Sequence, residues 1–437
     1  MKLEKEVKKL RKIVNDLRQI IHKQSIEIMD LHKENNRLLK RIAELEGTVK
    51  EKSKPFFIKD SVETKPLKTG QKKGHEGNSR CKPENIDETK VIDCDECPDC
   101  SGKLSGVQEV RSRIITDIEI NIVNREYLIH RRYCKCCKKM VEARITDALP
   151  NARYSLKLML LIMMLKAGLR MPSKRIVDFF NLFSLQISDG EIYNVLDRLK
   201  LAFADYYCVL VEKMREARKK HIDESSWRIG GKNHWIWIFI NEEIALFEIQ
   251  KSRGSKVPIE VLGNQDGKTF TTDRFSAYNV LVSETGGTQQ VCWTHLIRNT
   301  KDLSEFRTEA KYIHKRLKYI YRKAREGKTP KEKLLQWIDL IKSRHYKSTE
   351  VNKFIRSVCK NHRDDLFRFV DDPCIEPTNN LAERGLRHAV VIRKISGGSR
   401  SKKGADTTAK LLSVMQTIRM KEGNPINNMM HLLQKPK

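Results

Sequence analysis

The sequence predicts a multidomain α+β protein, in which an N-terminal coiled coil and a cysteine-rich region precede a mixed α/β domain. Three observations predict this class: a heptad pattern over residues 1–47, two Cys-x-x-Cys pairs within residues 91–145, and strand-like segments alternating with helical ones from residue 220. At 437 residues the chain is long enough for two or three domains.

The chain is strongly basic. Lys and Arg outnumber Asp and Glu by 86 to 56, a formal net charge of +30 at pH 7. Such an excess attracts phosphates or an anionic membrane surface. The longest apolar run, Leu158 to Leu165, is too short to span a bilayer, and the N-terminal MKLEKEVKK lacks the apolar core of a signal peptide. We therefore expect DNA rather than a membrane as the partner, and a cytoplasmic, nucleoid-associated location.

Residues 1–47 form the first predicted element, a coiled coil. The d positions are Leu3, Leu10, Leu17, Gln24, Leu31, Leu38 and Leu45, and the a positions are Val7, Val14, Ile21, Ile28, Asn35 and Ile42. β-Branched residues at a, Leu at d and one Asn at a favour a parallel two-stranded coiled coil, and hence a homodimer. The alternatives are an amphipathic helix packed on the same chain, or pairing with a helix of another protein.

Residues 48–90 read as a basic linker, because a stretch such as KPLKTGQKKGHEGNSR has too few apolar residues for a core. The linker is either a solvated tether or a segment that orders on DNA. In the second case the residues expected to contact phosphates are Lys72, Lys73, His75 and Arg80.

Residues 91–145 are predicted to form a zinc ribbon. Seven of the eleven cysteines lie between Cys81 and Cys137, a clustering typical of reduced thiols that hold a metal. Two Cys-x-x-Cys knuckles joined by strand-like sequence supply four thiolates, which close a tetrahedral, structural Zn²⁺ site. The expected ligands are Cys97, Cys100, Cys134 and Cys137. Cys94 and Cys136 leave the choice of ligands open.

Residues 150–219 are helical by pattern. SKRIVDFFNLF, a short SLQI turn and SDGEIYNVLDRLK resemble a helix-turn-helix, and Ser188 with Glu191 forms a capping box at the start of the second helix. Such a helix can enter the major groove of DNA. A plain helical connector is the alternative.

Residues 220–400 predict a ribonuclease-H-like domain. HIDESSWRI, HWIWIFI and IALFEIQ form a three-strand meander, and after a helical stretch KTFTTD and QQVCWTH add two more strands. The order β-β-β-α-β-α-β is that of the ribonuclease-H-like fold. We expect a helical, basic insertion at about 306–370, which contacts DNA or a second copy, and a C-terminal helical segment over 401–437.

Three acids of this domain have the settings of a metal site: Asp223 in the first strand, Asp273 at the end of the fourth and Glu383 in a later helix. Carboxylates are the ligands that Mg²⁺ prefers, and two ions about 4 Å apart can activate the attacking oxygen and stabilise the leaving 3′ oxygen. We therefore expect two Mg²⁺ ions, with Mn²⁺ as a substitute. Each acid also has a structural interpretation. Asp223 could be an edge-strand or turn residue, and Asp273 could be a helix N-cap. Glu383 could complete a capping box with Asn380 or form an ion pair with Arg387.

HIDESSWRI, CWTHLIRN and above all EPTNNLAERGLRHAVVIRKISGGSRSKKGA resemble the insertion-sequence-66 family of bacterial DDE transposases. The order of modules resembles that family too, over essentially the whole chain. The resemblance implies that Asp223, Asp273 and Glu383 are the catalytic acids, and that companion proteins of the same element take part. It also implies a Cys-x-x-His element, met by Cys292 and His295. A second zinc knuckle is one interpretation of this pair, but only one such pair exists. We therefore expect His295 to lie near the active site, where it orients a phosphate or an acid, and Cys292 to be structural.

The predicted activity is therefore cleavage of DNA at the ends of an insertion sequence and joining of the 3′-hydroxyls to target DNA. Basic residues near Glu383 are expected to hold phosphates. They are Arg384, Arg387, Arg393, Lys394 and Arg400. Two other classes remain: a non-catalytic DNA-binding regulator with a zipper and a zinc site, and a ribonuclease-H-like nuclease that cuts without joining.

Overall fold

The computed structural model describes residues 19, 24, 34, 85–118 and 120–434. The predicted coiled coil, apart from three single residues, and the linker up to residue 84 lie outside the described residues, and so do Lys72, Lys73, His75 and Arg80. The chain divides into two compact units, one ending at Thr116 and the other beginning at Asp117. This boundary falls inside the span predicted for the zinc ribbon.

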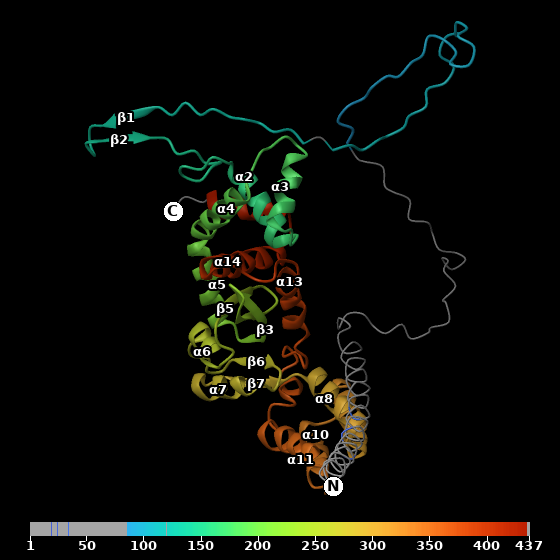
Figure 1. The fold of residues 1–437 in the computed structure, drawn as a ribbon, viewed down its shortest axis with the longest axis vertical. Coiled ribbons are helices and arrows are strands. Elements are labelled where there is room, and N and C mark those ends of the chain that lie inside the picture. The colour runs from blue at the N-terminus through green and yellow to red at the C-terminus, as the bar shows by residue number, and fades with distance from the viewer. Residues whose placement is uncertain (1–18, 20–23, 25–33, 35–84, 119, 435–437) are drawn as a thin grey trace, which may run out of the picture. The chain divides into compact units, whose positions relative to one another are not determined.

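A five-stranded mixed sheet forms the centre of the second unit (Figure 1). Its strands are β3 (Lys219–Ile229), β4 (Lys232–Ile240), β5 (Ala245–Gln250), β6 (Thr269–Thr272) and β7 (Thr288–Val291). β3, β4 and β5 are antiparallel neighbours, whereas β6 pairs in parallel with β3 and β7 in parallel with β6, which gives the order β5-β4-β3-β6-β7. The predicted strand and helix order of this region is confirmed.

Helices cover both faces of the sheet. One face packs on α5 (Ala204–Glu216), α6 (Lys256–Leu262) and α7 (Ser276–Thr285). On the other face, α13 (Asn380–Ser396) packs on β3 and β4, and α14 (Lys402–Arg419) packs on β5 (Figure 1). β4 is apolar on both sides because Trp237 and Phe239 point to the first face while Ile236 and Ile238 point to the second.

Both edge strands of the sheet are covered. The backbone N–H groups of Ala245 and Phe247 in β5 donate to the hydroxyls of Thr417 (3.1 Å) and Ser413 (2.8 Å) of α14. These two hydroxyl-bearing residues are 1% and 0% exposed. The helix thus satisfies donors that an open edge would present to another chain.

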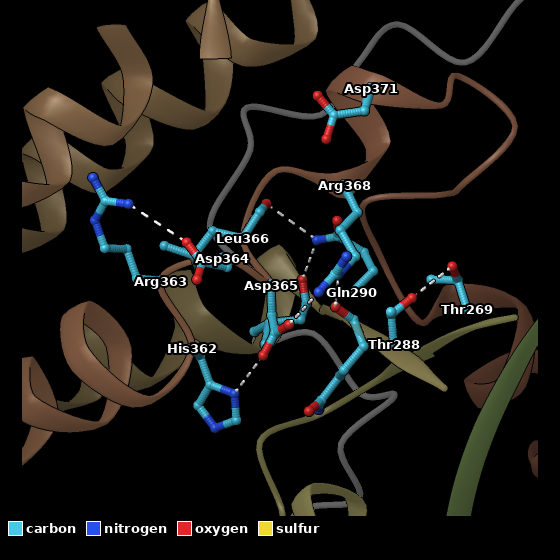
Figure 2. A network of polar contacts seen from close by, with 12 residues as sticks. Thr269, Thr288, Gln290, His362, Arg363, Asp364, Asp365, Leu366, Arg368 and Asp371 are labelled. Atoms are coloured by element: carbon cyan, nitrogen blue, oxygen red, sulfur yellow. Dashed lines mark hydrogen bonds and ion pairs between the residues drawn. The ribbon is translucent and has the colours of Figure 1, made fainter. Parts of the chain in front are cut away.

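The opposite edge, β7, is covered by the segment that returns from the helical insertion (Figure 2). The Val291 N–H donates to the Asp365 carbonyl (2.9 Å), and Arg368 donates to the Gln289 carbonyl (2.8 Å) and to the Asp365 carboxylate (3.2 Å). His362 Nδ1 contacts the other oxygen of Asp365 at 3.2 Å. This network fixes the end of the insertion to the sheet.

The insertion between β7 and α13 is helical, as the sequence predicts. It also has its own apolar core. It lies beyond β7 in Figure 1. Its elements are α8 (Trp293–Phe306), α9 (Thr308–Arg325), α10 (Lys331–Lys342), α11 (Thr349–Arg356), a π-helical turn (Ser357–Asn361) and α12 (Arg368–Asp371).

A helical layer precedes the sheet and shares a core with α13 and α14. It contains α2 (Leu156–Met163), a π-helical turn (Met164–Gly168), α3 (Ser173–Asn181) and α4 (Asp189–Ala202), and α15 (Pro425–Gln434) packs on α2. The predicted capping box of Ser188 and Glu191 is present at the start of α4. The connection over 182–188 is longer than the roughly three- or four-residue turn common in DNA-binding helix pairs.

The two cysteine knuckles each lie in a tight turn. In the first unit, Glu96 pairs with Lys103 around Cys97–Cys100, and in the second, β1 (Arg131–Cys134) and β2 (Lys139–Glu142) form a hairpin around the other knuckle. The alternating sequence before β1 was expected to be strand, but residues 115–118 and 120–130 carry no strand. Side chains such as Ile118 and Leu128 are 81% exposed there, and a strand needs a partner to pair its backbone.

Among the described residues, no helix is both long enough and apolar enough to cross a membrane.

Candidate active site

Asp223 lies in the middle of β3, opposite Ile238 of β4. Side chains alternate along the strand. Ile222 therefore enters the core beneath α7, while Trp227, an even number of residues from Asp223, enters the core shared with α13. Asp223 thus lies on the face that α13 covers, in a half-buried position.

Asp273 follows the last residue of β6, next to β3. The parallel register pairs His221 with Thr271, so its continuation by two residues brings Asp273 level with Asp223. The Oδ1 of Asp273 accepts a hydrogen bond from the Phe275 N–H at 2.8 Å, which fixes the carboxylate at the end of the strand. The N-cap of α7 is Phe275, without a side-chain cap, so the interpretation of Asp273 as N-cap is wrong.

Glu383 lies in the first turn of α13. The N-cap of this helix is Asn379, also without a side-chain cap, so the capping-box interpretation is wrong as well. Asn379 is fully buried. Its Nδ2 donates to the Ile222 carbonyl (2.8 Å) and its Oδ1 contacts His221 Nδ1 (3.2 Å). The motif NNLAERGLR contains this asparagine, but the sequence analysis assigned it no role.

Gly385 lets α13 approach the sheet. A Cβ at this position would lie 2.6 Å from Ile238 Cδ1 and 3.0 Å from Ile240 Cδ1, closer than carbon atoms pack. Asn379 and Gly385 together bring the helix, and with it Glu383, against the strand that carries Asp223.

The electrostatics place the three acids in one neighbourhood. Burial raises the pKa of Asp223 well above its ordinary value, and the charges of Glu224, Asp273 and Glu383 raise it further. Carboxylates that repel one another in this way are stabilised by a cation. The structure therefore places Asp273 and Glu383 within electrostatic range of Asp223.

Glu224 is an acid that the sequence analysis did not select. It lies on the opposite face of β3, 2% exposed at its side chain, where Arg253 donates to it (Nε 2.9 Å, Nη2 2.8 Å) and the Tyr278 hydroxyl bonds it. Burial raises the pKa of Glu224, and the bonds from Tyr278 and Arg253 act against this rise. Its partners make it a structural acid that adds negative charge behind Asp223.

His295 lies in the first turn of α8, with its Nδ1 3.6 Å from Glu383 Oε1. This distance exceeds a hydrogen bond, and both atoms are buried without a hydrogen-bond partner. Cys292, the N-cap of α8, is fully buried, and its Sγ accepts from the Asn379 N–H at 3.1 Å. His295 is thus next to Glu383, one of the three acids selected from the sequence.

The predicted DNA-contacting residues of α13 and the following loop differ in their surroundings. Arg384, Arg387, Lys394 and Arg400 are exposed. Arg393 instead donates to Ser225 Oγ (3.2 Å) and to the carbonyl and hydroxyl oxygens of Ser226 in β3. Its guanidinium therefore already holds the end of α13 to the strand of Asp223.

One thiol in each cysteine knuckle has a lowered pKa. Hydrogen bonds from the backbone of Asp99 and Cys100 lower the pKa of Cys97, and those from Cys137 and Cys136 lower the pKa of Cys134. A lowered pKa favours the thiolate, which is the form that binds metal.

The family described as Transposase IS66 family has a model that matches residues 151–407 of this chain. The match begins before α2 and ends within α14, so it contains the sheet, the insertion and all three acids. Among curated proteins, no relative of the chain was found.

Proposed function

Because this chain belongs to the IS66 family of transposases, we propose that it cleaves DNA at the ends of an insertion sequence and joins the freed 3′-hydroxyls to target DNA. The family makes it a DNA-modifying enzyme. The order of strands and helices supports cleavage and joining, because it is that of a ribonuclease-H-like fold. Acids lie on the first strand, after the fourth strand and on a later helix.

The observation that carries the proposal is the mutual repulsion of the acids. Burial and the charges of Glu224, Asp273 and Glu383 raise the pKa of Asp223. Glu383 Oε1 is buried without a hydrogen-bond partner. A carboxylate set with unsatisfied negative charge fits Mg²⁺ or Mn²⁺. Asp223, Asp273 and Glu383 would hold two such ions, which when bound activate the attacking oxygen and neutralise charge on the leaving oxygen.

In this proposal, residues of the chain hold the acids and the DNA in position. Asp223 lies in β3 and Asp273 follows β6, the parallel neighbour of β3. The Phe275 N–H fixes the carboxylate of Asp273. His295, 3.6 Å from Glu383, orients that acid or a DNA phosphate. Water or a DNA 3′-hydroxyl is the attacking group. Preorganised charge of this kind accounts for much of the rate of phosphoryl transfer.

Exposed basic side chains near the site hold the DNA strands in this proposal. They are Arg384, Arg387, Lys394 and Arg400. Arg393 of α13, whose guanidinium bonds β3, shares that role. The basic linker and the helix pair α3–α4 are further DNA-binding segments. The N-terminal heptads join two copies, so that two DNA ends meet in one complex. Companion proteins of the same element complete the machinery.

The zinc ribbon remains part of the proposal. Each knuckle forms a turn that presents its cysteines, and the lowered pKa values of Cys97 and Cys134 support metal binding. We propose that Zn²⁺ bound by these knuckles is structural, with Cys97, Cys100, Cys134 and Cys137 as the ligands that the sequence predicts.

A strand-joining assay with pre-cleaved element ends, a target plasmid and Mg²⁺ or Mn²⁺ tests the proposal. We expect joined products from the wild type and none from Asp273→Ala, with DNA binding retained. The loss should exceed the roughly 10–100-fold effects typical of changes around metal ligands. The control Asp302→Ala alters an exposed acid of α8 and should still join.

The two other function classes give different results. A regulator would show no metal-dependent product, and Asp273→Ala would keep its regulatory activity. A nuclease would cut intact ends but give no joined product with either metal ion.

A further inference from the structure

Three side chains that suit a thiophilic metal meet where two helices begin. Cys292 is the N-cap of α8, His295 lies in the first turn of that helix, and Glu383 lies in the first turn of α13. One ligand atom from each, the thiol sulfur, an imidazole nitrogen and a carboxylate oxygen, lie within 4.8 Å of one another.

The distance between His295 and Glu383 fits ligands of a shared ion better than a hydrogen bond. Nδ1 and Oε1 are 3.6 Å apart, whereas a hydrogen bond would bring them to about 2.7–3.2 Å. Nitrogen and oxygen ligands of one tetrahedral Zn²⁺ are separated by roughly 3.4 Å, given the usual bond lengths. Neither atom has a hydrogen-bond partner, although both are buried, and such groups call for an explanation.

Cys292 has the surroundings of a thiolate ligand. Its Sγ accepts a hydrogen bond from the Asn379 N–H at 3.1 Å. A bound cation would remove the cost of burying the thiolate, because coordinated thiols lose their proton.

We propose that Cys292 Sγ, His295 Nδ1 and Glu383 Oε1 form a binding site for Zn²⁺ or a similar thiophilic divalent cation. Sulfur and imidazole ligands select such ions over Mg²⁺, which prefers oxygen. Three protein ligands leave the fourth position of a tetrahedral ion open to water or to an oxygen of DNA. The site is distinct from the cysteine knuckles.

The shared residue gives the site a regulatory consequence, which rests on the proposed function. Glu383 belongs both to this set and to the acidic set with Asp223 and Asp273. Zn²⁺ bound through Oε1 withdraws that oxygen from the Mg²⁺-binding set. Zn²⁺ is therefore an inhibitor of strand joining that acts through Cys292.

Metal content tests the site without any assay of activity. The full chain is dialysed against Zn²⁺, and the bound equivalents are measured. Cys292→Ser should hold one equivalent fewer than the wild type and show less thiolate-to-Co²⁺ absorption after loading with Co²⁺. Cys359→Ser is the matched control, since Cys359 is also buried and belongs to the core of the insertion. It should keep the wild-type count.

An equal Zn²⁺ count in the wild type and in folded Cys292→Ser overturns the site. Circular dichroism checks the fold of each variant. Should Cys292→Ser not fold, His295→Gln provides the same comparison at a half-buried position.

The regulatory consequence has its own readout. Inhibition by Zn²⁺ at fixed Mg²⁺ is measured relative to each variant's own joining rate, and Cys292→Ser should need at least tenfold more Zn²⁺ than Cys359→Ser. Equal inhibition of both variants overturns the consequence. A wild type that joins no DNA while Cys292→Ser still loses its equivalent of Zn²⁺ refutes the proposed function and leaves the metal site standing.

Discussion

Gly385 offers a quantitative test of how the fold places Glu383. An alanine there puts its Cβ 2.6 Å from Ile238 Cδ1, about 1 Å short of ordinary carbon–carbon contact. Ile238 is fully buried in the sheet and cannot turn aside freely. The helix must therefore move away from β4 by a large part of that distance, and Glu383 moves with it.

The expected effect on stability is smaller than the effect on activity. Overpacking lowers the free energy of unfolding by about 1–3 kcal/mol. Replacing a glycine inside a helix by alanine raises it by about 1 kcal/mol, so the net decrease is about 0–2 kcal/mol. A displacement of about 1 Å at a catalytic group can cost about 10²-fold in rate. Gly385→Ala should therefore remain folded and join DNA about 10²-fold more slowly.

Stability is measured by urea unfolding followed through tryptophan fluorescence, since Trp227 and Trp237 are buried in the sheet, and activity by strand joining. Ile238→Val removes the clashing methyl at a cost of about 0.5–1.5 kcal/mol alone, and in the Gly385→Ala background it should restore part of the rate. Gly106→Ala, whose Cβ would meet no atom within 4 Å, is the control that should not slow joining. Joining at the wild-type rate by folded Gly385→Ala would refute the reasoning.

Three further predictions concern charge, edge contacts and DNA. Burial and neighbouring charges raise the pKa of Asp223 in the folded state. The protonated carboxyl therefore contributes to the free energy of unfolding in full below the unfolded pKa of about 3.9. This contribution is lost as the pH rises through the folded pKa. Asp223→Asn should thus raise the melting temperature in chelator at about pH 8 but not at about pH 4, and Mg²⁺ should stabilise only the wild type. Ser413→Ala leaves the buried Phe247 N–H unpaired and should cost about 1–3 kcal/mol in urea unfolding, whereas Ser396→Ala on the surface should cost less than about 0.5 kcal/mol. Arg384→Ala should lower the slope of log K for DNA against log salt by about 0.9, and an unchanged slope would exclude a phosphate contact.

The strand order and the setting of the three acids could be predicted from the sequence because their signals are local. Apolar runs bounded by turn residues define β3 to β7, and a carboxylate that interrupts an apolar strand or ends it is visible in the chain itself. Parallel pairing of β3 with β6 then brings Asp223 and Asp273 together, since the fold class fixes which strands are neighbours.

Other features depend on contacts between distant segments and left no local signal. Residues 401–437 were expected as a separate C-terminal helical segment, yet α14 bonds the backbone of β5 through Thr417 and Ser413. Glu224 looked equivalent to any polar strand residue until Arg253 and Tyr278 were placed beside it. The partners of a side-chain hydroxyl or carboxylate can be identified only from the three-dimensional structure.

The positions of Asn379, Gly385 and Arg393 explain how α13 is held on the sheet. Asn379 bonds the Ile222 carbonyl at the start, and Arg393 bonds Ser225 and Ser226 near the end. Gly385 removes the side chain that would hold the middle of the helix away from the sheet. All of these fix the helix against the central strands, and the two end contacts are made to the strand that carries Asp223. The position of Glu383 relative to Asp223 is then set by the two end contacts together with the close approach that Gly385 permits in between.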